Sequence, residues 1–256
     1  PKKIIQTSDN GFIIAGSSNS EISGYKTENC YGYIDFWIVK LDSNGTFEWE
    51  KTIGGSLYDE LISIIETNEG DFILAGSSSS NISNDKSEDS RGEIDYWIVK
   101  INASGLIIWD KTYGGTGVDK ISTIQKTSDN GFIVGGYSNS NISGDKTENS
   151  KGSFDYWVIK INDNGQMMWQ KTIGGSNNDE LKSIIQLIDG SYILAGLSFS
   201  NISGDRTISN SNFQDAWLVK LSNFGTIIWQ ENYNVEDFSK LISTSAVLFC
   251  TNLSLV

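Results

Sequence analysis

The chain has 256 residues and a formal net charge of −13, with 26 glycines, one proline and no histidine. A chain of this length can bury a sizeable core without disulfide or metal staples. Its acidity disfavours nucleic acid and anionic membrane surfaces as partners, and the absence of histidine excludes Ser-His-Asp and Cys-His catalysis and histidine-bound zinc. The two cysteines, Cys30 and Cys250, are far apart and predict free thiols. No apolar run is long enough to span a membrane.

The sequence repeats with a period of 60 residues. The phrases GFIIAGSS, DFILAGSS, GFIVGGYS and SYILAGLS begin at residues 11, 71, 131 and 191. A period without insertions is typical of solenoids, propellers and arrays. The eight tryptophans follow the same period in two sets, one being Trp37, Trp97, Trp157 and Trp217, the other Trp49, Trp109, Trp169 and Trp229.

Within the second repeat, strands are expected over residues 61–67, 72–77, 95–102 and 106–113, because each run is rich in β-branched and aromatic residues and turn residues separate the runs. Two tight hairpins join them into a four-stranded antiparallel unit. Positive φ is expected at a glycine in every hairpin. These glycines are Gly11, Gly70, Gly131 and Gly190 in the first turn, and Gly45, Gly105, Gly165 and Gly225 in the second.

The pattern predicts an all-β fold, a β-propeller of four-stranded antiparallel blades, as one domain over residues 1–256. The repeats cover approximately 1–53, 54–113, 114–173 and 174–233, and 234–256 forms a C-terminal tail. Within the tail, 241–250 aligns with the first strand of a fifth unit. The alternative is therefore a fragment of a larger propeller.

Two long phrases, DFWIVKLDSNGTFEW at 35–49 and DYWIVKINASGLIIW at 95–109, carry a resemblance to a known family. Three units then continue as KTIGG or KTYGG. In this pattern the chain resembles the β-propeller repeats of secreted and cell-surface bacterial proteins. The resemblance implies an extracellular or cell-surface location, a place within a larger multidomain protein, and a binding or scaffolding role. It implies no catalytic residues. The fourth unit departs from it with Glu231 to Val235, where the glycine pair is lost.

The long loops between the second and third strands are the candidate functional face, because long ordered loops on a rigid scaffold usually carry function. Carboxylates recur in these loops and in the connections that follow the fourth strands. Such oxygens could bind Ca²⁺, but the spacing matches no strict calcium motif, and turn-capping hydrogen bonds are the favoured interpretation. The candidate binding residues are Asp59, Asp119, Asp179, Asp85, Asp145, Asp205, Glu28, Glu88 and Glu148.

A further aspartate precedes each tryptophan of the first set by two residues. Because these aspartates recur in every repeat, a structural role, in which they accept backbone hydrogen bonds, is favoured over catalysis. For the same reason, packing between blades is favoured over sugar stacking as the role of the tryptophans. These aspartates are Asp35, Asp95, Asp155 and Asp215.

The sequence predicts a non-catalytic binding or scaffold module that recognises a protein or glycan through its acidic loop face, with no cofactor other than possible Ca²⁺. Each candidate residue exists in three or four copies, whereas a catalytic site gathers unlike residues in one place. Two alternatives stay open. One is a lectin with several equivalent sites. The other is a glycoside hydrolase or lyase that uses a pair of carboxylates.

Overall fold

A computed structural model describes residues 1–211 and 213–234. In these residues all regular structure is β: sixteen strands form four antiparallel sheets of four strands, each made by one repeat of about 60 residues. The predicted all-β, propeller-like fold of four blades is therefore confirmed. The described residues form no helix that could cross a membrane. The predicted fifth-unit strand at 241–250 and Cys250 lie outside the described residues.

The four sheets share one plan, in which strands follow each other in sequence order. The first contains β1 (Lys3–Gln6), β2 (Phe12–Ser18), β3 (Asp35–Leu41) and β4 (Phe47–Ile53). The second contains β5 (Asp59–Glu66), β6 (Phe72–Ser78), β7 (Asp95–Ile101) and β8 (Ile107–Tyr113). The third contains β9 (Asp119–Lys126), β10 (Phe132–Ser138), β11 (Asp155–Ile161) and β12 (Met167–Ile173). The fourth contains β13 (Asp179–Gln186), β14 (Tyr192–Ser198), β15 (Asp215–Leu221) and β16 (Ile227–Asn234).

The hairpin glycines were predicted correctly in six of eight cases. Gly70 has φ 83° and Gly190 has φ 82°, and the four glycines of the second hairpins are also positive. In the other two turns the asparagine before the glycine takes the left-handed conformation, with Asn10 at φ 66° and Asn130 at φ 64°. Asparagine tolerates this region better than other residues with a side chain. The predictions for Gly11 and Gly131 were therefore wrong.

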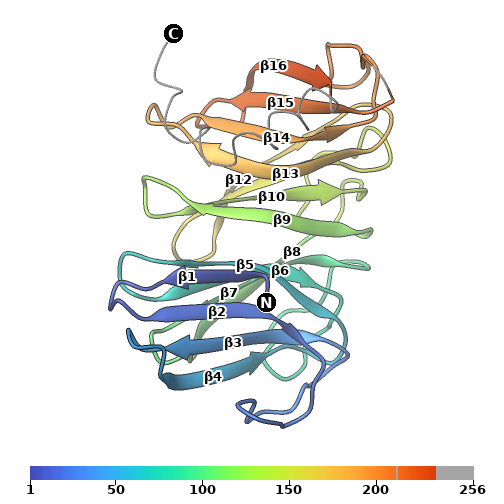
Figure 1. The fold of residues 1–256 in the computed structure, drawn as a ribbon. Helices are drawn as coiled ribbons and strands as arrows, with labels where there is room; N and C mark the ends of the chain where they lie inside the picture. The colour runs from blue at the N-terminus through green and yellow to red at the C-terminus, as the bar shows by residue number, and fades with distance from the viewer. Residues whose placement is uncertain (212, 235–256) are drawn as a thin grey trace.

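Consecutive sheets pack face to face, and each junction buries one apolar cluster. Figure 1 shows the sheets in chain order, with the blue first sheet and the orange fourth sheet at opposite ends of the stack. Among the described strands, packing between sheets joins first to second, second to third and third to fourth. The described residues therefore form an arc with two open ends. At the first junction, Phe36 and Ile38 pack against Leu74, Trp97 and Val99.

An aromatic side chain from each of the first three sheets reaches into the next. Phe36 lies with its ring centroid 4.9 Å from that of Trp97, and Tyr96 lies 4.7 Å from Trp157. The third example is Tyr156, 5.1 Å from Trp217. We call these three residues the knobs. They come from the third strand of one sheet and contact the tryptophan of the third strand of the next.

Candidate functional site

Each long loop between the second and third strands carries a tight turn with an exposed isoleucine. In the second sheet, Ser83 and Lys86 form a small antiparallel bridge around Asn84, which has φ 48°. Ile82 stands before this turn, and its backbone N–H donates to Asp89 at 3.0 Å. The isoleucines are exposed to nearly the same extent: Ile22 59%, Ile82 61%, Ile142 61% and Ile202 63%.

Three of the turns are attached to the connection that leads from the preceding sheet into their own sheet. The Ser83 hydroxyl accepts the backbone N–H of Ser56 at 2.9 Å. The equivalent Ser143 accepts the N–H of Thr116 at 2.9 Å, and Ser203 that of Ser176 at 2.8 Å. The exposed isoleucines of these three turns are thus held on loops that are bonded to the connections between sheets.

A cation lies buried beneath each turn. Lys146 is 2% exposed, and its ammonium group lies 5.2 Å from the Trp157 ring centroid and donates to Ser138 at 2.9 Å and to Thr172 at 3.1 Å. Burial lowers the pKa of Lys146 to about 8, against the opposing attraction of nearby carboxylates. These residues were not among the predicted site residues, although they recur with the 60-residue period. The set is Lys26, Lys86, Lys146 and Arg206.

The predicted binding glutamates are held against the fourth strand of their own sheet. Glu88 forms an ion pair of 2.6 Å with Lys111 and accepts the backbone N–H of Thr112 at 3.0 Å. Burial alone would raise the pKa of Glu88, but these two bonds hold it below its usual value. Glu28 and Glu148 make the same pair of contacts, with Lys51 and Thr52 and with Lys171 and Thr172.

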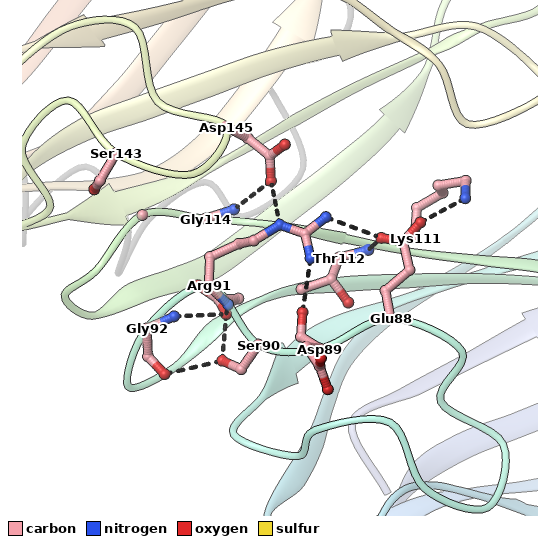
Figure 2. A network of polar contacts seen from close by, with 12 residues as sticks. Glu88, Asp89, Ser90, Arg91, Gly92, Lys111, Thr112, Gly114, Ser143 and Asp145 are labelled. Carbon is pink, nitrogen blue, oxygen red and sulfur yellow. Dashed lines mark hydrogen bonds and ion pairs between the residues drawn. The ribbon is translucent and has the colours of Figure 1, made fainter.

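The aspartates three residues before these glutamates reach back to the preceding sheet. Asp145 accepts the N–H of Gly114 at 3.3 Å and the Nε–H of Arg91 at 3.2 Å. Arg91 also contacts Glu88 at 3.3 Å, so one guanidinium joins carboxylates from two successive loops (Figure 2). Asp205 likewise accepts the N–H of Gly174 and forms an ion pair with Lys151.

Asp85 differs from the other two because Tyr31 occupies the place that Arg91 takes in the next repeat. Asp85 accepts the N–H of Gly54 at 3.2 Å. Burial and the charge of Glu28 raise the pKa of Asp85 to about 6. Asp85, Glu28 and Tyr31 line one pocket of about 230 Å³.

The predicted aspartates at the start of each following sheet are inaccessible. Asp59 is 0% exposed, and its Oδ2 accepts the N–H of Gly55 at 2.6 Å and the hydroxyl of Ser80 at 3.0 Å. Asp119 and Asp179 make equivalent bonds and are equally buried. These three residues are therefore placed to hold the connection between sheets, and a ligand at the surface cannot reach them.

The aspartates before the tryptophans close the long loops. Asp95 Oδ2 accepts the backbone N–H of Arg91 at 2.6 Å and the hydroxyl of Ser90. Burial raises the pKa of Asp95 to about 6, and the charge of the nearby Asp119 contributes. Asp35, Asp155 and Asp215 make corresponding bonds to backbone N–H groups of their own loops.

Six of the buried aspartates keep an oxygen without a hydrogen-bond partner in the described structure. The Oδ1 atoms concerned belong to Asp35, Asp59, Asp95, Asp119, Asp155 and Asp179. No group of three or more acidic or cysteine side chains among the described residues is arranged to hold a metal ion. The carboxylates are spread over three sheet junctions and do not converge on one centre. Ca²⁺ binding stays a prediction.

The two sets of tryptophans make different contacts. In the first set, Trp97, Trp157 and Trp217 are 0% exposed, and the Trp97 indole N–H donates to Asp110 at 3.0 Å. In the second set, Trp109 lies against Gly165 of the next sheet, and its indole N–H donates to the carbonyl oxygen of Asp163 at 3.2 Å. The sheets thus contact each other through both sets.

Comparisons with known proteins identify distant similarity. No family model matches the chain. Regulatory protein FlaEY of Caulobacter vibrioides is 24% identical over 174 residues, which cover 64% of this chain and 18% of that protein. The chain thus spans less than a fifth of that relative. A Bacteroides caccae protein of unknown function has 12% identity and a TM-score of 0.30, with 79% of this chain and 78% of that one covered. A Synechocystis apocarotenoid oxygenase mutant has 8% identity and a TM-score of 0.38, with 90% and 68% covered.

Proposed function

We propose that the protein is a non-catalytic binding module that recognises a protein partner through the isoleucine-bearing loop turns. The observation that carries this proposal is the exposure of Ile22, Ile82, Ile142 and Ile202, at 59–63%, on equivalent turns, three of which are bonded to the connection between two sheets. A single exposed isoleucine needs no explanation. Four on equivalent turns offer a repeated apolar contact, and little loop entropy is lost when a partner binds.

We assign the acidic loop face the ordering role that the turn-capping interpretation of its carboxylates predicted. Most of its recurring carboxylates are committed to lysine, arginine and backbone N–H groups. They order the loops, and the apolar turns remain available for contact. Following the family resemblance, we also propose an extracellular or cell-surface location for this module.

A peptide selection tests the proposal. Phage-displayed peptides are selected on the immobilised protein and then measured against a variant in which the four turn isoleucines are changed to serine. The matched control changes the exposed strand residues Ile108, Met168 and Ile228 to serine, at 51%, 63% and 54% exposure. We expect the turn variant to lose binding and the control to keep it. Equal binding by both variants would refute the proposal, and binding to a glycan array in place of peptides would favour the lectin alternative.

One observation favours the competing carboxylate-pair enzyme. Asp85, whose pKa is raised to about 6, and Glu28 share the pocket of about 230 Å³ with Tyr31, and glycoside hydrolysis uses a pair of carboxyl groups, one of which has a raised pKa. A panel of chromogenic glycosides tests this function. Turnover that is abolished by Asp85→Asn and kept by Asp145→Asn would support an enzyme. Absence of turnover by the wild type supports the binding module.

A further inference from the structure

At the second junction, one guanidinium group joins two loop carboxylates that belong to successive repeats. Arg91 contacts Glu88 at 3.3 Å and Asp145 at 3.2 Å (Figure 2). The third nitrogen of the same group donates to the backbone carbonyl oxygen of Asp89 at 2.8 Å. Lys111 also forms an ion pair with Glu88, at 2.6 Å. Two carboxylates and two cations therefore balance each other at this junction.

The third junction keeps the same balance with two lysines. Lys151 stands sixty residues after Arg91 and forms an ion pair with Asp205. Lys171 forms an ion pair with Glu148 at 2.6 Å. The position of Arg91 is thus taken by a cation at both of these junctions.

The first junction has one cation fewer. Its carboxylates are Glu28 and Asp85, and Lys51 forms an ion pair with Glu28 at 2.7 Å, but Tyr31 stands where the next two repeats carry a cation. In the described part of the chain, no lysine or arginine forms an ion pair with Asp85, which accepts the backbone N–H of Gly54 at 3.2 Å. Burial raises the pKa of Asp85 to about 6, and the charge of Glu28 contributes, as expected for a carboxylate without a neighbouring cation.

A pocket lies at the place of the missing cation. Its volume is about 230 Å³, and its lining includes Glu28, Tyr31, Thr52, Asp85, Leu106 and Ile107. Tyr31 is 43% exposed, so solvent reaches this side of the lining. The volume is below the roughly 300–1,000 Å³ of pockets for drug-sized ligands and suits a single side chain. Carboxylates attract the charged head of a long cationic side chain, while aliphatic and aromatic groups contact its stem.

The second junction indicates which cation fits best. A guanidinium group presents its donors as a planar fork, so one group can serve two carboxylates at once. Arg91 does so with Glu88 and Asp145. The equivalent carboxylates of the first junction, Glu28 and Asp85, line one pocket. A guanidinium group can therefore make the same pair of contacts there.

The loops of the first junction also carry exposed aromatic side chains. Two residues after Tyr31, the ring of Tyr33 stacks on that of Tyr58 at 4.9 Å between centroids, and the two residues are 61% and 54% exposed. The equivalent positions at the later junctions carry Glu93 with Val118 and Ser153 with Asn178. Tyrosine and arginine are both enriched in protein interfaces, where they supply much of the binding energy. The first junction thus combines an unfilled cation position with a surface suited to a protein.

From these contacts we propose that the pocket at the first junction binds the guanidinium group of a partner protein's arginine, inserted beside Tyr31 between Glu28 and Asp85. The partner supplies the charge that Arg91 supplies within the chain at the second junction. The assignment to a partner protein rests on the proposed binding function, whereas the guanidinium site itself does not.

The first experiment titrates the protein with N-acetylarginine amide and follows the backbone amide of Gly54, which donates to Asp85, in ¹H–¹⁵N NMR spectra. We expect a saturable shift. N-acetylcitrulline amide has nearly the same shape without the charge and should bind about tenfold more weakly or worse, because charge-assisted hydrogen bonds are lost. Asp85→Asn should weaken binding of the arginine probe to a similar extent. Asp145→Asn is the matched control and should leave it unchanged, because Arg91 already occupies that carboxylate.

The second experiment moves the cation within the chain. Tyr31→Arg should fill the pocket from the first loop, abolish binding of N-acetylarginine amide and raise the melting temperature. Tyr31→Phe, which keeps the ring and adds no charge, should still bind. Arg91→Tyr should open a second site, so that the amide of Gly114, which donates to Asp145, also responds to the probe. The proposal is overturned if the wild type binds the arginine and citrulline probes equally or not at all, or if Tyr31→Arg binds as the wild type does.

This inference and the proposed function fail by different results. The variant with four serine turns keeps the pocket and should still bind N-acetylarginine amide. If that probe does not bind while selected peptides still depend on the isoleucines, the guanidinium site is wrong and the binding module stands. If the probe binds but the selected peptides bind Tyr31→Arg as tightly as the wild type, the assignment to a partner protein is overturned.

Discussion

Asp95 and Asp215 occupy the same position in the second and fourth repeats, but their pKa values are shifted in opposite directions. Burial raises the pKa of Asp95 to about 6. Burial would also raise the pKa of Asp215, but bonds from Ser211 and Asn232 and the charge of Arg206 hold it below its usual value. Neither the Asn232 contact nor the guanidinium of Arg206 has an equivalent in the second repeat, where the corresponding residues are Thr112 and Lys86.

These two aspartates should give opposite pH dependences of stability. Asp95 binds its proton more tightly in the folded state than in the unfolded chain, where its pKa is 3.8, so its stabilising contribution is present below pH 3.8 and is lost as the pH rises through about 6. Relative to Asp95→Asn, the wild type should lose up to about 3 kcal/mol of unfolding free energy between pH 4 and pH 7. Urea denaturation across this range measures it.

Asp215→Asn is the control, because the contribution of Asp215 to the unfolding free energy should change with pH in the opposite direction. Because the folded-state pKa of Asp215 is lowered, its contribution is present above the unfolded pKa and is lost as the pH falls through the folded value. The wild type should therefore gain stability relative to this variant as the pH rises. Parallel pH profiles for the two variants would contradict the assignment.

The tyrosine knobs differ from Phe36 by one hydroxyl group, and this difference can be measured. The Tyr96 hydroxyl is buried and bonded to Trp157, so Tyr96→Phe should lower the free energy of unfolding by about 1 kcal/mol. Tyr25→Phe is the control, because Tyr25 is 72% exposed, and it should cost almost nothing. A destabilisation shared equally by both variants would show that the buried hydrogen bond contributes nothing specific.

At the scale of elements, the strands follow the sequence closely because their pattern is set by burial. The expected strand at 106–113 is β8 (Ile107–Tyr113), and that at 72–77 is β6 (Phe72–Ser78). The loops were harder to predict. A lysine such as Lys86, within a run of asparagine, serine and aspartate, suggests solvent exposure, yet it lies beneath Trp97 and is 1% exposed. Its burial depends on acceptors from other strands, which no local pattern reveals.

The loop turns themselves depend on one residue with positive φ. Asn84 at φ 48° holds the position that Gly24, Gly144 and Gly204 hold in the other repeats. Asn84→Ala should destabilise the protein by about 1 kcal/mol, because alanine is strained in this region. Asn84→Gly should be nearly neutral. Thermal denaturation of the two variants checks this, and equal melting temperatures would show that the turn does not need the left-handed conformation.

At the scale of the whole molecule, the period predicts equivalent surroundings for residues sixty apart, and the open ends of the arc limit that equivalence. Val99 and Val219 are 0% exposed, whereas Val39, at the same position in the first sheet, is half-buried. The repeat length could be predicted from sequence. The arrangement of the ends could not, because it depends on which sheets meet rather than on the pattern within one sheet.

Substitution of these three valines measures how far the equivalence holds. Val99→Ala should cost about 1.5–3 kcal/mol, because it removes two buried methyl groups and leaves a cavity between packed sheets. Val219→Ala should cost a similar amount, since the fourth sheet receives the Tyr156 knob as the second receives Phe36. Val39→Ala should cost less than about 1 kcal/mol, because water already reaches that face. Chemical denaturation of the three variants gives the comparison, and an equal loss at all three positions would mean that the first sheet is covered in solution as fully as the others.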